Sequence, residues 1–161
     1  MLRQIKFLLV DDQPVIRSIV SAILKSAGAQ TIEYACDGSS ALEAMRTQQF
    51  DIVITDMMMA GVDGLDLVRL VRGASDSPNV YQPIIMLTAR TEAAFVHAAR
   101  DAGVTESACK PISAANLLSR VNAVIMRPRP FVRAGEFFGP CRRRRSDERL
   151  QSLKRRKADQ A

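Results

Sequence analysis

Five polar side chains at the ends of predicted strands are of types that suit the chemistry of a phosphoryl group. They are Asp11, Asp12, Asp56, Thr88 and Lys110. Clustered carboxylates repel one another, and Mg²⁺ relieves that repulsion when bound by one or two carboxylates with other oxygens. A lysine supplies a mobile charge for phosphate, and an aspartate carboxylate can attack phosphorus to form an aspartyl-phosphate. If the fold brings these side chains together, they predict a magnesium-dependent site for phosphoryl transfer.

Each of these residues also has an ordinary structural explanation. An aspartate after a strand, such as Asp56, commonly caps a loop or a helix. Surface acids, a strand-end threonine and a solvated lysine before a turn are equally common. The functional interpretation therefore depends on the elements that position the five residues.

Alternating strands and helices predict an α/β fold that delivers these residues to one edge of a sheet. Four mostly apolar segments are typical of strands, residues 5–10, 31–35, 52–56 and 83–88, and residues 105–109 form a weaker fifth. A stretch with helical spacing follows each of them, over residues 14–27, 41–45, 64–71, 91–102 and 113–125. Near-continuous apolar strands between amphipathic helices indicate a doubly wound parallel sheet that is covered on both faces. Such sheets bind ligands at the carboxyl ends of their strands, where all five residues would lie.

The composition places the protein among globular chains that consist of one domain with an appendage. It has 161 residues, of which 47% are hydrophobic. No apolar run approaches the ~20 residues that cross a membrane, and the N-terminal segment reaches two acids too soon for a secretory signal. Three widely spaced cysteines favour a reducing, cytoplasmic location over a disulfide or zinc framework.

Positive charge is concentrated in the last 35 residues. Residues 127–161 carry 12 Lys or Arg against 4 Asp or Glu, whereas residues 1–126 carry 11 against 13. Pro128 and Pro130 end the last predicted helix, and we expect little regular structure over residues 131–141. A short helix beginning near Ser146 is predicted at the C-terminus. A basic segment of this kind favours nucleic acid, an anionic membrane or an acidic protein as its partner. A solvated, disordered segment and one that folds back on the preceding domain are equally compatible with the sequence.

Four motifs together resemble the receiver domain of bacterial two-component response regulators. They are Phe-Leu-Leu-Val-Asp11-Asp12, Thr-Asp56-Met-Met-Met-Ala-Gly-Val-Asp-Gly64, Met-Leu-Thr88-Ala89 and Cys-Lys110-Pro111. The resemblance covers about residues 3–126, a receiver domain that is followed by a basic tail at 127–161. It implies a flavodoxin-like parallel sheet with strand order 2-1-3-4-5.

The resemblance also implies a role for each site residue. Asp56 would be the phosphoacceptor, and Thr88 and Lys110 would contact the phosphoryl group. Four ligands would bind Mg²⁺: Asp11, Asp12, Asp56 and the backbone carbonyl of Met58. A histidine kinase or a phosphotransfer protein would supply the phosphoryl group, and the domain would catalyse its own phosphorylation and dephosphorylation. No dedicated catalytic output domain is expected, so the signal would pass by contact with a downstream protein.

Two positions depart from the receiver pattern. Ala60 stands where the family usually has proline, which removes backbone stiffness but no chemistry. Ser107, three residues before Lys110, stands where the family has an aromatic side chain that moves inward when the threonine engages the phosphoryl group. The route from phosphorylation to an output surface therefore differs in this chain.

Two other functions are compatible with the same residues. The basic tail could bind nucleic acid, with its arginines beside aromatics stacking on bases and contacting phosphates, and the receiver would then be a regulator or a vestige. Such binding would weaken steeply with salt and disappear without residues 127–161. A Mg²⁺-dependent phosphohydrolase is less well supported, because no separate general base accompanies Asp56.

Overall fold

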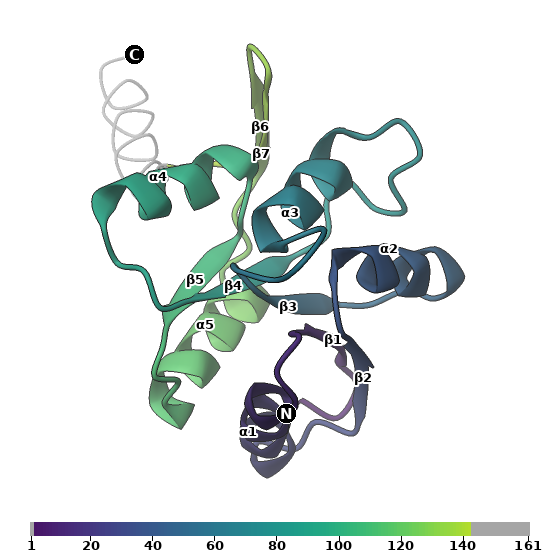
Figure 1. Cartoon of the computed structure of the whole chain (residues 1–161), viewed down its shortest axis with the longest axis vertical. Coiled ribbons are helices and arrows are strands. Elements are labelled where there is room, and N and C mark those ends of the chain that lie inside the picture. Colours follow the sequence, from purple (N-terminus) through teal and green to yellow (C-terminus); the bar gives the residue numbers. More distant parts are fainter. Residues whose placement is uncertain (1, 143–161) are drawn as a thin grey trace, which may run out of the picture.

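Five parallel strands form the centre of the structure, in the order β2-β1-β3-β4-β5 (Figure 1). They are β1 (Lys6–Val10), β2 (Thr31–Ala35), β3 (Ile52–Asp56), β4 (Ile84–Thr88) and β5 (Glu106–Cys109). The structure is a computed structural model and describes residues 2–142. The predicted α/β fold and its strand order 2-1-3-4-5 are confirmed.

Five helices cover the two faces of this sheet. They are α1 (Pro14–Ser26), α2 (Gly38–Thr47), α3 (Gly64–Gly73), α4 (Ala93–Ala102) and α5 (Ala114–Met126). Alternate side chains of β1 point to opposite faces: Leu8 packs in a core with α2, α3 and α4, whereas Phe7 and Leu9 pack in a core with α1 and α5. The sheet is thus buried on both sides, as its near-continuous apolar strands predicted.

Side-chain caps fix where two of the helices begin. The Asp63 carboxylate accepts a hydrogen bond from the backbone N–H of Asp66 (2.9 Å) and starts α3. The Ser113 hydroxyl accepts one from the N–H of Asn116 (3.2 Å) and starts α5, as predicted. These caps begin the helices that follow β3 and β5, the strands whose ends lie at Asp56 and beside Lys110.

Residues 131–140 form an antiparallel β-hairpin, so the expectation of an irregular segment there is wrong. Its strands are β6 (Phe131–Ala134) and β7 (Phe137–Pro140). Gly135, with a φ of 61°, permits the two-residue turn between them. Pro130 and Pro140 lie just before the first strand and at the end of the second, where proline is tolerated. The helix predicted near Ser146 lies outside the described residues.

The hairpin packs on the ends of α3 and α4 through aromatic rings and a buried arginine. Phe131 and Phe138 each lie edge-on to Tyr81, with centroids 5.2 and 5.6 Å away. The Arg72 guanidinium lies 5.0 Å from the centre of the Phe131 ring. Arg72 is 5% exposed, and its burial lowers its pKa to about 10. The folded body therefore continues past the predicted domain boundary at residue 126.

Arginines and aromatic rings that the sequence analysis considered for stacking on nucleic-acid bases contact one another in the structure. Arg133 lies over the Phe138 ring at 4.8 Å, and Arg142 lies over Phe137 at 4.2 Å. Arg142 also pairs with Asp101 of α4 at 3.0 Å. Within residues 2–142, both arginines thus bind the protein's own groups, and a nucleic-acid partner stays a prediction.

A chain that ends at Met126 is expected to be less stable than one that ends at Arg142, by about 3 kcal/mol in the free energy of unfolding. Losing the hairpin exposes Arg72 and removes the burial of Phe131 and Phe138, each worth roughly 1.5–3 kcal/mol if complete. Urea unfolding of the two chains measures the difference. Equal midpoints and slopes would show that the hairpin adds nothing to the fold.

Candidate functional site

The carboxyl edge of the sheet collects the five predicted residues. Asp11 follows β1, Asp56 ends β3, Thr88 ends β4 and Lys110 follows β5. The parallel register keeps these ends level, because Asp56 pairs with Leu87 and Thr88 pairs with Cys109. Residues up to 99 positions apart in the sequence thus meet at one edge.

Three carboxylates and one ammonium group form the centre of the site. Asp11, Asp12 and Asp56 each offer an oxygen within 4.8 Å of the others. The Lys110 Nζ lies 3.0 Å from an Asp56 oxygen and 3.9 Å from an Asp11 oxygen. Asp11 and Asp56 are buried, at 3% and 6% exposure, whereas Asp12 is exposed. One lysine does not balance three carboxylates, so the cluster favours an additional cation.

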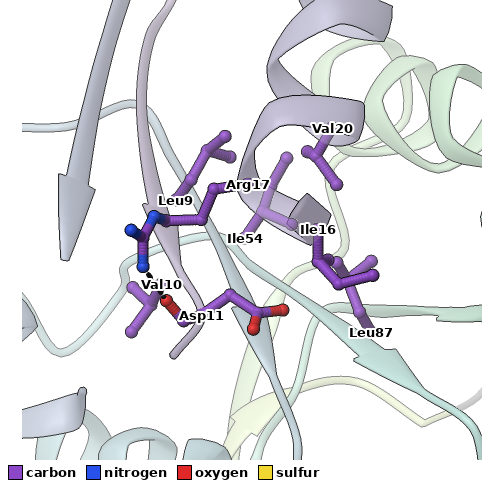
Figure 2. A pocket seen from close by; sticks show the side chains of 8 residues that line it. All are labelled: Leu9, Val10, Asp11, Ile16, Arg17, Val20, Ile54 and Leu87. Atoms are coloured by element: carbon purple, nitrogen blue, oxygen red, sulfur yellow. Dashed lines mark hydrogen bonds between the residues drawn. The ribbon is translucent and has the colours of Figure 1, made fainter. Parts of the chain in front are cut away.

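The Asp11 carboxylate has one oxygen that is suited to a metal ion. Its Oδ1 accepts a hydrogen bond from the Gln13 backbone N–H at 2.9 Å. Its Oδ2 is buried and accepts no hydrogen bond. The Arg17 guanidinium donates to the Asp11 backbone carbonyl at 2.6 Å, and Figure 2 shows the guanidinium and the carboxylate on opposite sides of that backbone. A hard cation at Oδ2 would satisfy an atom that the protein leaves without a donor.

Burial raises the pKa of Asp11 above its ordinary value. The Gln13 N–H opposes this shift, and the neighbouring Asp56 carboxylate adds to it. The mostly apolar pocket beside Asp11 in Figure 2, with Leu9, Ile54 and Leu87 in its lining, gives the ionised group little solvation. Without a metal ion, the ionised Asp11 carboxylate therefore lowers the stability of the folded protein.

The Thr88 hydroxyl is turned toward the loop that follows β4. It donates to the Arg90 carbonyl (3.1 Å) and accepts from the Arg90 N–H (2.9 Å). Its oxygen also lies 3.3 Å from the Met57 sulfur. Arg90 was not singled out in the sequence, because no local pattern reveals that a side chain two residues away will bond to its backbone.

Three further residues from the sequence analysis, Met58, Ala60 and Ser107, lie in the loop after β3 or on β5. Met58 is 55% exposed and lies in the loop that leaves β3 directly after the site. Ala60 lies in the same loop, and Ser107 lies on β5 opposite Met86 of β4. The metal-binding role of the Met58 carbonyl stays a prediction.

Gly64 is a site-supporting residue that the sequence interpretation treated only as a turn signal. A Cβ at this position would collide with the backbone carbonyl oxygen of Asp56. The Gly64 N–H also donates to the Met57 carbonyl at 3.1 Å. The first turn of α3 can therefore lie against the end of β3 only because residue 64 has no side chain.

The family profile described as "Response regulator receiver domain" matches residues 7–122. The chain belongs to the response regulator receiver family. Chemotaxis protein CheY-3 of Vibrio cholerae is 33% identical over 125 residues, which cover 78% of this chain and 95% of the relative. The match ends before β6, so the hairpin lies outside the family's shared part.

Two solved structures show the same fold at similar coverage. The Vibrio cholerae chemotaxis protein CheY4 aligns with a TM-score of 0.69 and 34% identity over 76% of this chain and 99% of that one. The receiver domain of a Pseudomonas aeruginosa sensor histidine kinase aligns with a TM-score of 0.68 and 27% identity, over 77% and 99%. That structure has a magnesium ion coordinated in its active site cleft. The predicted receiver fold and the homology to two-component response regulators are thereby confirmed.

Asp11→Asn is expected to raise the free energy of unfolding at pH 7 without metal, on the order of 1 kcal/mol. Because the folded pKa of Asp11 lies above its unfolded value, the folded state binds more protons between the two values. Stability is therefore lost as the pH rises through that interval, and the ionised carboxylate destabilises the fold above it. Urea unfolding in EDTA measures the effect.

The matched measurement repeats the same unfolding curves with Mg²⁺. The ion should stabilise the wild type more than Asp11→Asn, because binding to the folded state alone raises stability by mass action. A variant that is less stable than the wild type in EDTA would contradict the assigned cost of Asp11.

Proposed function

We propose that the protein accepts a phosphoryl group on Asp56 from a histidine kinase or a phosphotransfer protein, and signals by contact with a downstream protein. One observation carries the proposal: the Asp56 carboxylate is buried at 6% exposure with the Lys110 ammonium 3.0 Å away. This carboxylate lies at the carboxyl edge of the sheet and has a cation beside it. These are the requirements of a nucleophile toward phosphorus.

The reaction forms an Asp56 Oδ–P bond while the bond between phosphorus and the donor nitrogen breaks. The electron pair of the broken bond stays on the donor imidazole. Lys110 neutralises charge on the phosphoryl oxygens, and the Thr88 hydroxyl donates to one of them after turning from Arg90. Asp11, Asp12, Asp56 and the Met58 carbonyl would hold Mg²⁺, which when bound would screen the phosphoryl charge. Hydrolysis of the acyl phosphate returns the carboxylate.

Incubation with Mg²⁺ and acetyl phosphate tests this function. Intact mass should increase by one phosphoryl group in the wild type and remain unchanged in Asp56→Asn. Asp63→Asn serves as a control for a carboxylate outside the cluster, since Asp63 caps α3. Equal labelling of wild type and Asp56→Asn, or no labelling at all, would contradict the proposal.

We further propose that the protein acts in the cytoplasm. Its three cysteines, Cys36, Cys109 and Cys141, are free, and the first two are exposed. Exposed free thiols are typical of a reducing compartment. Within residues 2–142, no helix combines the length and the apolarity that crossing a membrane requires.

A further inference from the structure

We propose that α4 transmits the phosphorylation state of Asp56 to the C-terminal hairpin, residues 131–140. The hairpin would then be the element that responds, in place of an aromatic side chain on β5, where this chain has Ser107. The inference rests on the proposed function, because it requires a phosphoryl group on Asp56. Its steps follow contacts between the site and the hairpin.

The first step is a choice of hydrogen-bond partner at Thr88. The hydroxyl has one proton, and its two acceptors in the structure are neutral: the Arg90 carbonyl at 3.1 Å and the Met57 sulfur at 3.3 Å. A phosphoryl group on Asp56 would add charged acceptor oxygens at the same sheet edge. Hydrogen bonds to ionised acceptors are roughly twice as strong as neutral ones. Turning toward the phosphoryl group would release the Arg90 backbone, so Thr88 and Arg90 form an element with two discrete arrangements.

The second step joins Arg90 to the beginning of α4. The Arg90 guanidinium lies 4.5 Å from the centre of the Phe95 ring. Phe95 is in the first turn of α4 and packs against the core below α2 and α3. The helix start has no side-chain cap from Glu92, and Phe95 attaches this end both through the core and through the Arg90 guanidinium. Movement of Arg90 therefore alters the support of α4.

The third step lies at the other end of α4, where the hairpin docks (Figure 1). A Cβ on Gly139 of β7 would lie 3.0 Å from the Cα of Gly103, the left-handed residue that ends α4. Arg72 donates to the Gly103 carbonyl at 3.0 Å while it lies beneath Phe131. Gly139 and Gly103 are closely packed, so displacement of α4 disrupts the packing that holds the hairpin on the domain.

Hydrogen exchange of the full chain measures the response, on the same samples whose intact mass reports phosphorylation. With Mg²⁺ and acetyl phosphate, amides of residues 131–140 should exchange at least about fivefold faster than with Mg²⁺ alone, the lower end of typical coupling. Arg90→Ala should gain the phosphoryl group without this change in exchange. Arg127→Ala, a substitution of an exposed arginine on the hairpin side, should behave as the wild type.

Coupling between two sites is reciprocal, which supplies a second measurement. Gly139→Val places a side chain against Gly103 and should undock the hairpin without touching Asp56. If the docked hairpin stabilises the unphosphorylated conformation, undocking it removes that stabilisation. The affinity for beryllofluoride with Mg²⁺, a mimic of the phosphoryl group, should rise about fivefold or more in this variant.

The outcomes separate the inference from the proposed function. A mass increase with unchanged hairpin exchange would overturn the inference and leave the function standing. A hairpin response in Arg90→Ala as large as in the wild type, or beryllofluoride affinity of Gly139→Val within twofold of the wild type, would also overturn it. Absence of the mass increase would overturn both.

Discussion

Lys110→Ala is expected to slow phosphorylation by acetyl phosphate by roughly two to three orders of magnitude, the usual effect of losing one preorganised charge partner. The ammonium lies 3.0 Å from Asp56 and 3.9 Å from Asp11, so in the proposed reaction it is the positive side chain that would meet the incoming phosphoryl oxygens. Its removal also leaves three carboxylates within 4.8 Å of one another with no side-chain cation among them. Intact mass against time measures the rate.

Two variants make this result specific. Lys25→Ala removes an exposed lysine from the last turn of α1 and should keep the wild-type rate. Lys110→Arg keeps the charge in a planar group of different shape, and should recover only part of the loss. A Lys110→Ala rate within threefold of the wild type would remove Lys110 from the proposed reaction.

Gly64→Ala is expected to lower the free energy of unfolding by about 3 kcal/mol, the upper part of the range for overpacking. The new methyl group would collide with the Asp56 carbonyl oxygen, which is backbone and cannot rotate away. Relief of the collision must move either the start of α3 or the end of β3. We therefore expect phosphorylation to slow together with the loss of stability, even well below the unfolding midpoint.

Gly73→Ala is the matched control because it lies at the other end of the same helix. A Cβ there meets no atom within 4 Å, and Gly73 has no positive φ. Alanine at a compatible glycine usually stabilises a protein by roughly 0.4–1 kcal/mol, through a less flexible unfolded chain. If both substitutions had the same effect, the contact between Gly64 and Asp56 would not be what constrains this position.

The sequence was sufficient for the sheet and for the centre of the site. Asp56 ends a fully buried strand and Lys110 follows a partly buried one, so their meeting depends only on strand order and direction. The alternation of apolar strands with amphipathic helices predicted the parallel direction, because each strand and helix must bury its own apolar side. The strand order came from the resemblance to receiver domains. The clustering of Asp11 with Asp12 and Asp56 followed from the same argument.

The features that were missed depend on contacts between elements far apart in the sequence. The hairpin is stabilised by docking on Arg72, Tyr81 and Gly103, and an isolated two-stranded hairpin would be marginal. Its two prolines and its charges pointed instead to an irregular segment. The bond between Thr88 and Arg90 depends on a single side-chain rotation, which residue types do not determine.

The docked hairpin, which contacts Gly103 through Gly139, also affects where this receiver can be joined to another domain. Chimeric regulators are built by joining a receiver to a new output domain near the end of α5, which in this chain ends at Met126. A junction there would remove the covering of Arg72 and the two aromatic rings that pack edge-on against Tyr81. A fusion that keeps residues up to Arg142 would retain the hairpin that covers Arg72. The fused domain would then begin beside α4, because Arg142 pairs with Asp101 of that helix.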